Sequence, residues 1–174
     1  MTPGLPCRIS PVTPSCAPAV CALAREIWYQ HYPGIITVRQ IDYMLDQRYR
    51  PETILEQIAS GRAWWDKIEV EGRLAGFAQY ELGSKPGSMK LDKIYVHSRY
   101  RGKGYGSALL AHVEAATRGK GMRTLYLQVN KGNSSSIAVY RRNGFEVTGS
   151  IKVDIGGGFF MDDYVMEKTV TNDG

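Results

Sequence analysis

The chain has 174 residues, a length typical of one domain built around a single hydrophobic core. Hydrophobic residues make up 43% of the sequence and charged residues 22%, which excludes disordered and collagen-like classes. The 22 lysines and arginines outnumber the 17 acidic residues, and the net charge of +5 indicates a negatively charged partner, either a nucleic acid or a phosphorylated cofactor.

The sequence also bears on the compartment in which the protein works. It contains no apolar run of membrane-spanning length, and its start, MTPGLPCRIS, lacks the charged and apolar regions of a signal peptide. Cys7, Cys16 and Cys21 are odd in number and have no CxxC spacing, so we expect free thiols rather than a metal or disulfide site. A cytoplasmic protein without a bound metal is therefore expected.

The first third of the chain is predicted to form one strand and three helices. A short strand is expected over residues 8–12. Residues 15–30 carry apolar side chains at helical spacing, and Ser15 is the predicted N-cap. Helices are also expected over residues 38–47 and 51–59, the second with proline at its first position, where proline is tolerated.

Six strands and two helices are expected in the rest of the chain. Residues 63–70 and 73–82 form a predicted hairpin around Glu71-Gly72. The other four strands are expected over residues 89–97, 124–129, 146–155 and 160–168.

One of the two helices is expected over residues 106–118, where leucine and valine recur at helical spacing. The other is expected to run from its N-cap, Asn133, to Asn143, where Gly144 supplies a left-handed stop. The order of elements predicts an α/β (or α+β) fold over residues 1–174, a single domain with a mixed central sheet of about six or seven strands flanked by helices.

The junction after the strand at residues 89–97 combines bare backbone with positive charge, in the stretch YVHSRYRGKGYGSALL. Its glycines let the chain turn tightly and approach a ligand closely. The helix that follows presents unpaired N–H groups and the positive end of its dipole, which together predict a phosphate site. The basic residues at its rim are Arg99, Arg101 and Lys103.

Two common phosphate motifs do not match this junction. A Walker A loop requires a lysine and a hydroxyl residue after the last glycine, and the chain has neither there. A dinucleotide fingerprint requires GxGxxG with an acidic residue at the end of the next strand, whereas here the glycines run GxGxG and that strand ends in Val129-Asn130. Taken alone, the loop fits a flexible, solvated connection as well as it fits a phosphate site.

A second motif decides between these interpretations. The pattern R-x-x-G-x-G at residues 101–106 is followed by NSSSIAVYRRNGF at residues 133–145, and the pair resembles the GNAT superfamily of N-acetyltransferases, which move the acetyl group of acetyl-CoA to a primary amine. The Asn, Tyr, Gly and Phe of the second segment match the family signature in type and spacing, while Ser136 replaces the usual alanine. The resemblance covers residues 63–168 well and implies a sheet that splays between its fourth and fifth strands.

The resemblance implies roles for residues on the acetyl-CoA side. Backbone groups of Ile94, Tyr95 and Val96 would pair with the pantetheine arm and stabilise the developing oxyanion. Asn133 would hydrogen-bond the same arm, with Ser136 beside it. The pyrophosphate would be held by the residues of the loop and the helix start, namely Arg101, Gly102, Lys103, Gly104, Tyr105, Gly106 and Ser107.

Tyr140 is the residue that the resemblance assigns to protonation of the departing thiolate, although a core tyrosine on an amphipathic helix is the alternative. An ammonium must lose a proton before it attacks, and Glu81 and then Asp92 are the candidate bases. No motif supports either carboxylate, and a solvated surface position is the other interpretation of each. His97 and His112 have a suitable pKa range, but His112 falls in the middle of a helix.

The identity of the acetyl acceptor is what the sequence predicts least clearly. The stretches WYQHYPGIITVRQIDYML and DIGGGFFMDDYVM are similar to bacterial polyamine-acetylating members, and an acidic patch with an aromatic groove would suit a polycation. A solvated helix face and ordinary core packing are the alternatives. The candidate residues are Asp42, Asp46, Asp162 and Asp163, with Trp28, Tyr29, Tyr32 and Tyr43.

Three other functions stay open from the sequence. The acceptor would be a protein N-terminus or lysine, the chain would bind CoA without chemistry, or it would be a basic nucleic-acid-binding module. The last requires aromatic residues interleaved with the basic ones, and only Tyr100 and Tyr105 qualify, so no nucleic-acid or membrane partner is expected. Residues 156–160 would shape either a homodimer contact or the mouth of the acceptor site.

Overall fold

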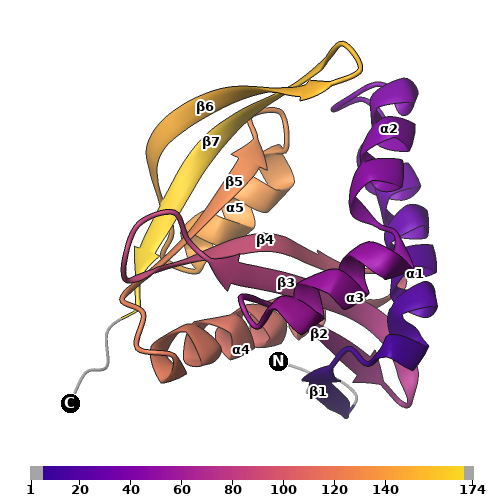
Figure 1. Cartoon of the computed structure of the whole chain (residues 1–174), viewed down its shortest axis with the longest axis vertical. Helices are drawn as coiled ribbons and strands as arrows, with labels where there is room; N and C mark the ends of the chain where they lie inside the picture. The colour runs from indigo at the N-terminus through magenta and orange to yellow at the C-terminus, as the bar shows by residue number, and fades with distance from the viewer. Residues whose placement is uncertain (1–5, 171–174) are drawn as a thin grey trace.

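The structure is a computed structural model, and it describes residues 6–170 (Figure 1). Parts of the MTPGLPCRIS segment and of the 1–174 domain therefore lie outside the described residues. The strands are β1 (Cys7–Pro11), β2 (Ala63–Val70), β3 (Arg73–Leu82), β4 (Ser88–Val96), β5 (Thr124–Asn130), β6 (Glu146–Gly156) and β7 (Phe159–Thr169). The helices are α1 (Ala17–His31), α2 (Val38–Arg48), α3 (Pro51–Ser60), α4 (Tyr105–Gly119) and α5 (Ser134–Arg142), with short 3-10 turns at η1 (Pro14–Cys16) and η2 (Ser98–Tyr100).

Every strand and α-helix expected from the sequence is present. The predicted start of α1, however, differs from the observed one. Ser15 is not the N-cap, because it lies inside η1, and Cys16 caps α1 instead. Pro18 explains the shift: proline lacks an N–H and is tolerated only in the first turn of a helix, so α1 has to begin just before it.

The seven strands form one mixed sheet in the order β1-β2-β3-β4-β5-β7-β6. All neighbours are antiparallel except β4 and β5, which run parallel. The parallel pair is hydrogen-bonded over a short stretch only, from Ser88–Lys90 on β4 to Thr124–Tyr126 on β5. Beyond it the two strands separate, which confirms the expected splay.

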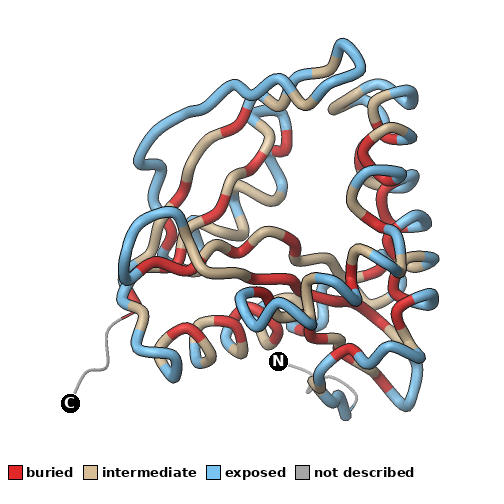
Figure 2. Tube along the Cα trace, in the orientation of Figure 1, coloured by how far each residue is buried: buried red, intermediate tan, exposed pale blue. Residues whose placement is uncertain are grey.

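Helices cover both faces of the sheet and bury two hydrophobic cores. On one face α4 packs Leu109, Leu110 and Val113 against the central strands. On the other face α1, α2 and α3 bury a core that contains Trp28 and Phe77. Figure 2 shows buried positions along the central strands and along one side of the helices. Within residues 6–170 no helix is both long and apolar enough to cross a membrane.

Candidate active site

A bulge in β4 lies where this strand separates from β5. The register with β3 shifts between Gln79 and Tyr80, so that Asp92 has no paired residue there. A bulge interrupts the alternation of side chains along a strand, which is why the neighbours Asp92 and Lys93 contact each other instead of pointing to opposite faces. On the β5 side, no described strand pairs with residues 91–96, so a row of β4 backbone groups is available to a ligand.

An open cavity of about 260 Å³ lies along this edge of β4. Its walls come from β4, from the loop before α4, from α4 itself, from α1 and from α5. The structure therefore brings together residues that the sequence places far apart. The predicted residues that line this open cavity are Ile94, Tyr95, Val96, Arg101, Gly106, Ser136 and Tyr140.

The glycine-rich loop forms one end of the open cavity. Gly104 has φ +88° and is the N-cap of α4, and Gly102 has φ +74°, backbone conformations that disfavour any L side chain. Because α4 begins there, its first N–H groups have no partner within the helix. The Arg101 side chain bridges back to the strand, donating from Nε to the Val96 carbonyl at 3.2 Å.

The remaining loop residues divide into exposed and buried groups. Lys103 and Ser107 are exposed, so their side chains are available to an anion. Tyr105 is only 3% exposed, and its side chain belongs to the core under α4. The bulk of this side chain is therefore accommodated inside the protein.

Asn133 is the N-cap of α5, as expected. Its side chain makes no capping hydrogen bond, and its Oδ1 contacts Nε2 of His31 at 3.0 Å instead. Burial lowers the pKa of His31, and the nearby Arg101 lowers it further, against the effect of the hydrogen bond. A neutral imidazole that donates to the amide oxygen fits this pairing, and it ties α1 to the start of α5.

Tyr140 lies at the inner end of the open cavity. It comes from the last half of α5 and packs edge-on against Phe145 at 5.9 Å between ring centroids. Burial raises the pKa of Tyr140 above its usual value, and the nearby Tyr32 adds to the shift. The phenol therefore keeps its proton at neutral pH, as a proton donor must.

A second cavity of about 80 Å³, the enclosed cavity, is smaller and less open to solvent, and it too has Tyr140 in its wall. Segments far apart in the chain form its walls, with Trp28 from α1, Arg48 from α2 and Asp163 from β7. Four residues line both cavities, namely Ile94, Tyr95, Ser136 and Tyr140. The two cavities therefore meet at one shared wall that contains the Tyr140 side chain.

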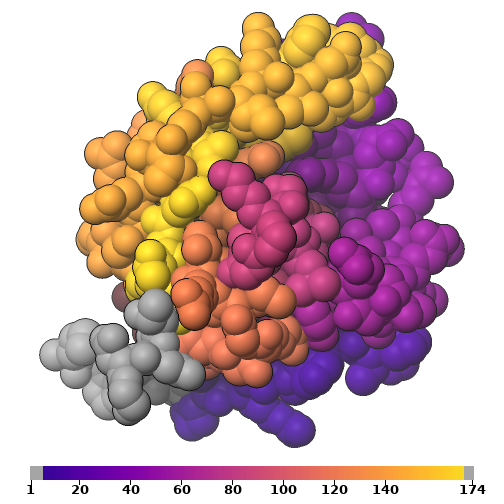
Figure 3. All heavy atoms as spheres, turned by 60° about the vertical axis from the view of Figure 1, so that its left-hand side comes forward, coloured from indigo at the N-terminus to yellow at the C-terminus, as the bar shows by residue number. Residues whose placement is uncertain are grey.

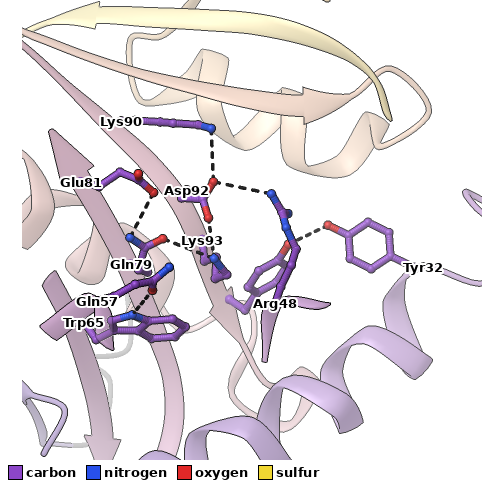
Figure 4. Close-up of polar contacts among 10 residues, drawn as sticks. Tyr32, Arg48, Gln57, Trp65, Gln79, Glu81, Lys90, Asp92 and Lys93 are labelled. Atoms are coloured by element: carbon purple, nitrogen blue, oxygen red, sulfur yellow. Dashed lines mark hydrogen bonds and ion pairs between the residues drawn. The ribbon is translucent and has the colours of Figure 1, made fainter. Parts of the chain in front are cut away.

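A charged network supports the wall of the enclosed cavity (Figure 4). Asp92 forms ion pairs with Lys93, with Lys90 at 3.4 Å and with Arg48 at 3.8 Å. Burial by itself raises the pKa of Asp92, but the three cations outweigh burial and hold this pKa well below its usual range. Lys93 is 4% exposed and also donates to Gln79 Oε1 at 3.3 Å. Asp92 is thus a fixed anion within the network.

The two candidate bases lie in different environments. Asp92 lines the enclosed cavity, but its side chain is 10% exposed, so a solvated surface position is wrong for it. Its lowered pKa makes it a weak base. Glu81 is half-buried on β3, where Oε1 accepts a hydrogen bond from Gln79 Nε2 at 3.3 Å, and it lines neither cavity. Its role as the base stays a prediction.

The four candidate carboxylates of the acceptor patch do not gather at one place. Asp42 accepts a hydrogen bond from the Tyr29 hydroxyl. Asp46 pairs with Arg50 one helical turn away, at 2.9 Å. The exposed Asp162 pairs with Lys131 at 3.1 Å, and of the four only Asp163 lines the enclosed cavity. Among the four candidate aromatic residues, Trp28 and Tyr32 line that cavity as well.

The β6–β7 hairpin closes the structure next to this cavity. Its tip lies against α2, as Figure 3 shows at the upper edge of the molecule. Tyr43 of α2 donates to the Ile155 carbonyl at 2.8 Å, and Gln40 donates to the Phe160 carbonyl at 2.9 Å. Met161, one residue further on, and Met44 of α2 both line the enclosed cavity, so β7 next to the hairpin tip and α2 each form part of its wall.

Comparison with known proteins agrees with this geometry. The sequence profile of the Acetyltransferase (GNAT) family matches residues 23–145, which is more than half of the chain. The chain belongs to the GNAT acetyltransferase family. The resemblance inferred from the two motifs is confirmed, and the chain is an acetyltransferase with acetyl-CoA as its acetyl donor.

Relatives of this GNAT enzyme include polyamine acetyltransferases. It is 27% identical to the spermidine N(1)-acetyltransferase of Thermoplasma acidophilum over 150 residues. The aligned region covers 84% of this chain and 86% of that protein. It is 33% identical over 94 residues to the spermine/spermidine N(1)-acetyltransferase of Bacillus subtilis, covering 48% of this chain and 60% of that one. The crystal structure of the PaiA N-acetyltransferase of T. acidophilum in complex with coenzyme A shares its fold, with a TM-score of 0.81 at 24% identity over 95% of this chain and 99% of that one.

The residues of the open cavity suit the acetyl donor of a GNAT enzyme. A bare β4 edge, a helix start and an arginine at the rim match a chain of amides that ends in phosphates. No group of three or more His, Cys, Asp or Glu side chains within residues 6–170 is arranged to hold a metal ion.

Sequence reasoning did not find His31 or Arg48. Each lies near the C-terminal end of a helix, α1 or α2, where a basic residue is ordinary. Only the packing of these helices onto β4 and α5 brings the two side chains to the cavities. No local signal in the sequence distinguishes them from solvated basic residues.

Proposed function

We propose that this GNAT enzyme transfers the acetyl group of acetyl-CoA to the primary amine of a small molecule, by direct attack while both substrates are bound. The observation that carries the proposal is the shared wall between the two cavities. A thioester in the open cavity and an amine in the enclosed cavity would approach each other at Tyr95 and Tyr140 without either substrate leaving.

The residues of the donor side would each have a separate task. The pyrophosphate would lie on the N-terminus of α4 beside Arg101, and the pantetheine arm along the bare edge of β4. A β4 backbone N–H would hydrogen-bond the thioester oxygen as negative charge develops on it. The Tyr140 hydroxyl would give its proton to the departing thiolate.

The enclosed cavity supports a small acceptor over a peptide. It has room for a few water molecules or one chain end, and its walls include Trp28, Tyr32 and Met161. The β6–β7 hairpin, which contacts α2, forms part of its wall. An alkylamine end fits such a space, and the polyamine relatives make spermidine the first acceptor to test.

A panel of acceptors tests the proposal. Release of coenzyme A is measured with acetyl-CoA and spermidine, spermine, butylamine or a peptide with a free N-terminal alanine. We expect turnover with the small amines and with at least one polyamine, and none above background with the peptide. Turnover confined to the peptide would contradict a small acceptor, and no turnover with any amine would contradict the transferase proposal.

A further inference from the structure

Asp163 combines features that no other described carboxylate of the enclosed cavity shares. It lies on β7 between Asn130 of β5 and Ile151 of β6, is 1% exposed and lines the cavity. Within residues 6–170, its Oδ2 atom has no hydrogen-bond partner. Leaving a buried carboxylate oxygen without a donor is costly, so this atom is the natural contact of an N–H group in the cavity.

We propose that Asp163 takes the proton from the ammonium group of the acceptor, a role that rests on the function proposed above. Asp163 and Tyr140 line the same cavity of about 80 Å³. In so small a space an amine would reach Asp163 directly or through one water molecule. The proton acceptor and the proton donor would therefore lie on one cavity, on either side of the reacting nitrogen.

The other carboxylates are less suited to this step. Asp92 also lines the cavity, but three cations hold it as an anion of low basicity. Glu81 lines neither cavity. Asp162, the neighbour of Asp163 in sequence, is exposed and paired with Lys131. Burial in the cavity wall without a paired cation distinguishes Asp163 from all three.

The charges around Asp163 are consistent with a base that works at neutral pH. Burial raises the pKa of Asp163 to about 6, and the adjacent Asp162 adds to the shift. Arg48 of α2, Lys90 of β4 and Lys131 after β5 act in the opposite direction, and the charge of Asp163 in turn contributes to the raised pKa of Tyr32. Asp163 is thus mostly ionised at pH 7 and more basic than an ordinary aspartate.

The step balances as a proton transfer followed by acyl transfer. The ammonium R–NH₃⁺ gives one proton to the Asp163 carboxylate, and the freed lone pair forms a C–N bond with the thioester carbon. The C–S bond then breaks, and the thiolate takes a proton from Tyr140. The nitrogen loses its second proton, which restores the Tyr140 hydroxyl, and the proton on Asp163 leaves to solvent. The products are the amide, coenzyme A and one released proton.

The test is the pH dependence of kcat/KM with spermidine. Wild type is compared with Asp163→Asn, with the matched control Asp162→Asn, and with Glu81→Gln. We expect wild type and Glu81→Gln to show an ascending limb with a midpoint near pH 6, and Asp162→Asn to keep this limb at a slightly lower pH, because the charge of Asp162 helps to raise the pKa of Asp163. Asp163→Asn should lose that limb and fall by about 10²-fold or more at pH 7.

Recovery at high pH separates a proton acceptor from a structural residue. Asp163→Asn should regain activity toward pH 10, because an alkylamine with a pKa of about 10 then loses its proton to solvent. A loss of constant size at every pH, or a limb near pH 6 that Asp163→Asn keeps, would overturn the role of Asp163. So would a limb that only Glu81→Gln removes.

Two further readouts keep the result decisive. Melting curves with and without acetyl-CoA show whether Asp163→Asn folds and binds the donor, and if it does not, the wild-type profile decides alone. A wild type that acetylates spermidine without a limb near pH 6 contradicts the proton-transfer role only. A wild type that acetylates no amine of the panel contradicts the proposed function and this inference together.

Discussion

The open and the enclosed cavity are built in opposite ways. The open cavity is built mainly from the end of β4, the loop after it and the start of α4, which follow one another in the chain, with additions from α5 and from His31 at the end of α1. The enclosed cavity takes its walls from α1, α2, β4, β5, α5 and β7. One site is therefore nearly continuous in sequence, whereas the other exists only after the chain has folded.

The electrostatics differ in the same way. Arg101, which lines the open cavity, and Lys103, which lies two residues further along the same loop, are both exposed. At the enclosed cavity, Arg48 of the wall and the neighbouring Lys90 and Lys93 pair with the carboxylate of Asp92, whereas Asp163 Oδ2 has no hydrogen-bond partner within residues 6–170. The first arrangement attracts a charged substrate, and the second holds charges in fixed places around a small space.

The largest expected effect comes from the wall that both cavities share. Tyr140→Phe removes the hydroxyl but keeps the ring that packs on Phe145. We expect kcat to fall by about 10²- to 10⁴-fold, since general acid catalysis contributes on this scale. Steady-state kinetics would measure kcat, and titration calorimetry should give an unchanged affinity for acetyl-CoA. An unchanged kcat would remove Tyr140 from its role.

The next effect should be confined to the open cavity. Gly104→Ala places a side chain at φ +88°, where nothing obstructs the new methyl group but the backbone conformation costs about 1–2 kcal/mol. The KM for acetyl-CoA should rise about tenfold, because 1.4 kcal/mol corresponds to a factor of ten. The control is Gly119→Ala in the last turn of α4, with open space and no left-handed backbone, which should leave this KM unchanged.

A smaller effect should be confined to the enclosed cavity. Gly157→Ala would place its methyl group 2.9 Å from the Tyr43 ring and so push the hairpin away from α2. The KM for spermidine should rise about threefold to tenfold, in line with the cost of overpacking, while the KM for acetyl-CoA stays the same. Gly158→Ala is the control, because it shares the left-handed backbone but meets no atom within 4 Å. Equal effects from both variants would contradict a role for the Tyr43 contact.

The smallest effect concerns stability. The pKa of Asp163 is about 6 in the folded state and about 4 in the unfolded state. Between pH 4 and pH 6 the folded state therefore binds more protons than the unfolded state, so the free energy of unfolding falls as the pH rises through this range. Asp163→Asn should therefore melt a few degrees higher than wild type above pH 6 and equally at pH 4, at roughly 2–4 °C per kcal/mol. Scanning calorimetry at both pH values measures this, and a lower melting temperature at pH 7.5 would contradict it.

Local patterns were enough to predict the elements and the left-handed glycine turns that end or begin them. Gly102 and Gly104 are required by a left-handed backbone, and Gly144 ends α5 in the same way with φ +92°, so their positions in the sequence report conformation directly. The misplaced cap at Ser15 and the missing cap hydrogen bond of Asn133 have another origin. Whether a polar side chain bonds its own helix or a distant partner such as His31 depends on what packs against it.

The sequence by itself determined the order of strands and helices and the glycine-rich turn at the start of α4, because hydrophobic periodicity and glycine conformation act between neighbours in the chain. Only the tertiary structure decided that Arg48, Asp92 and Asp163 face one cavity and that three of the four candidate acceptor-side carboxylates do not. Burial and charge pairing set the properties of these groups, and both arise from contacts between segments that are distant in sequence.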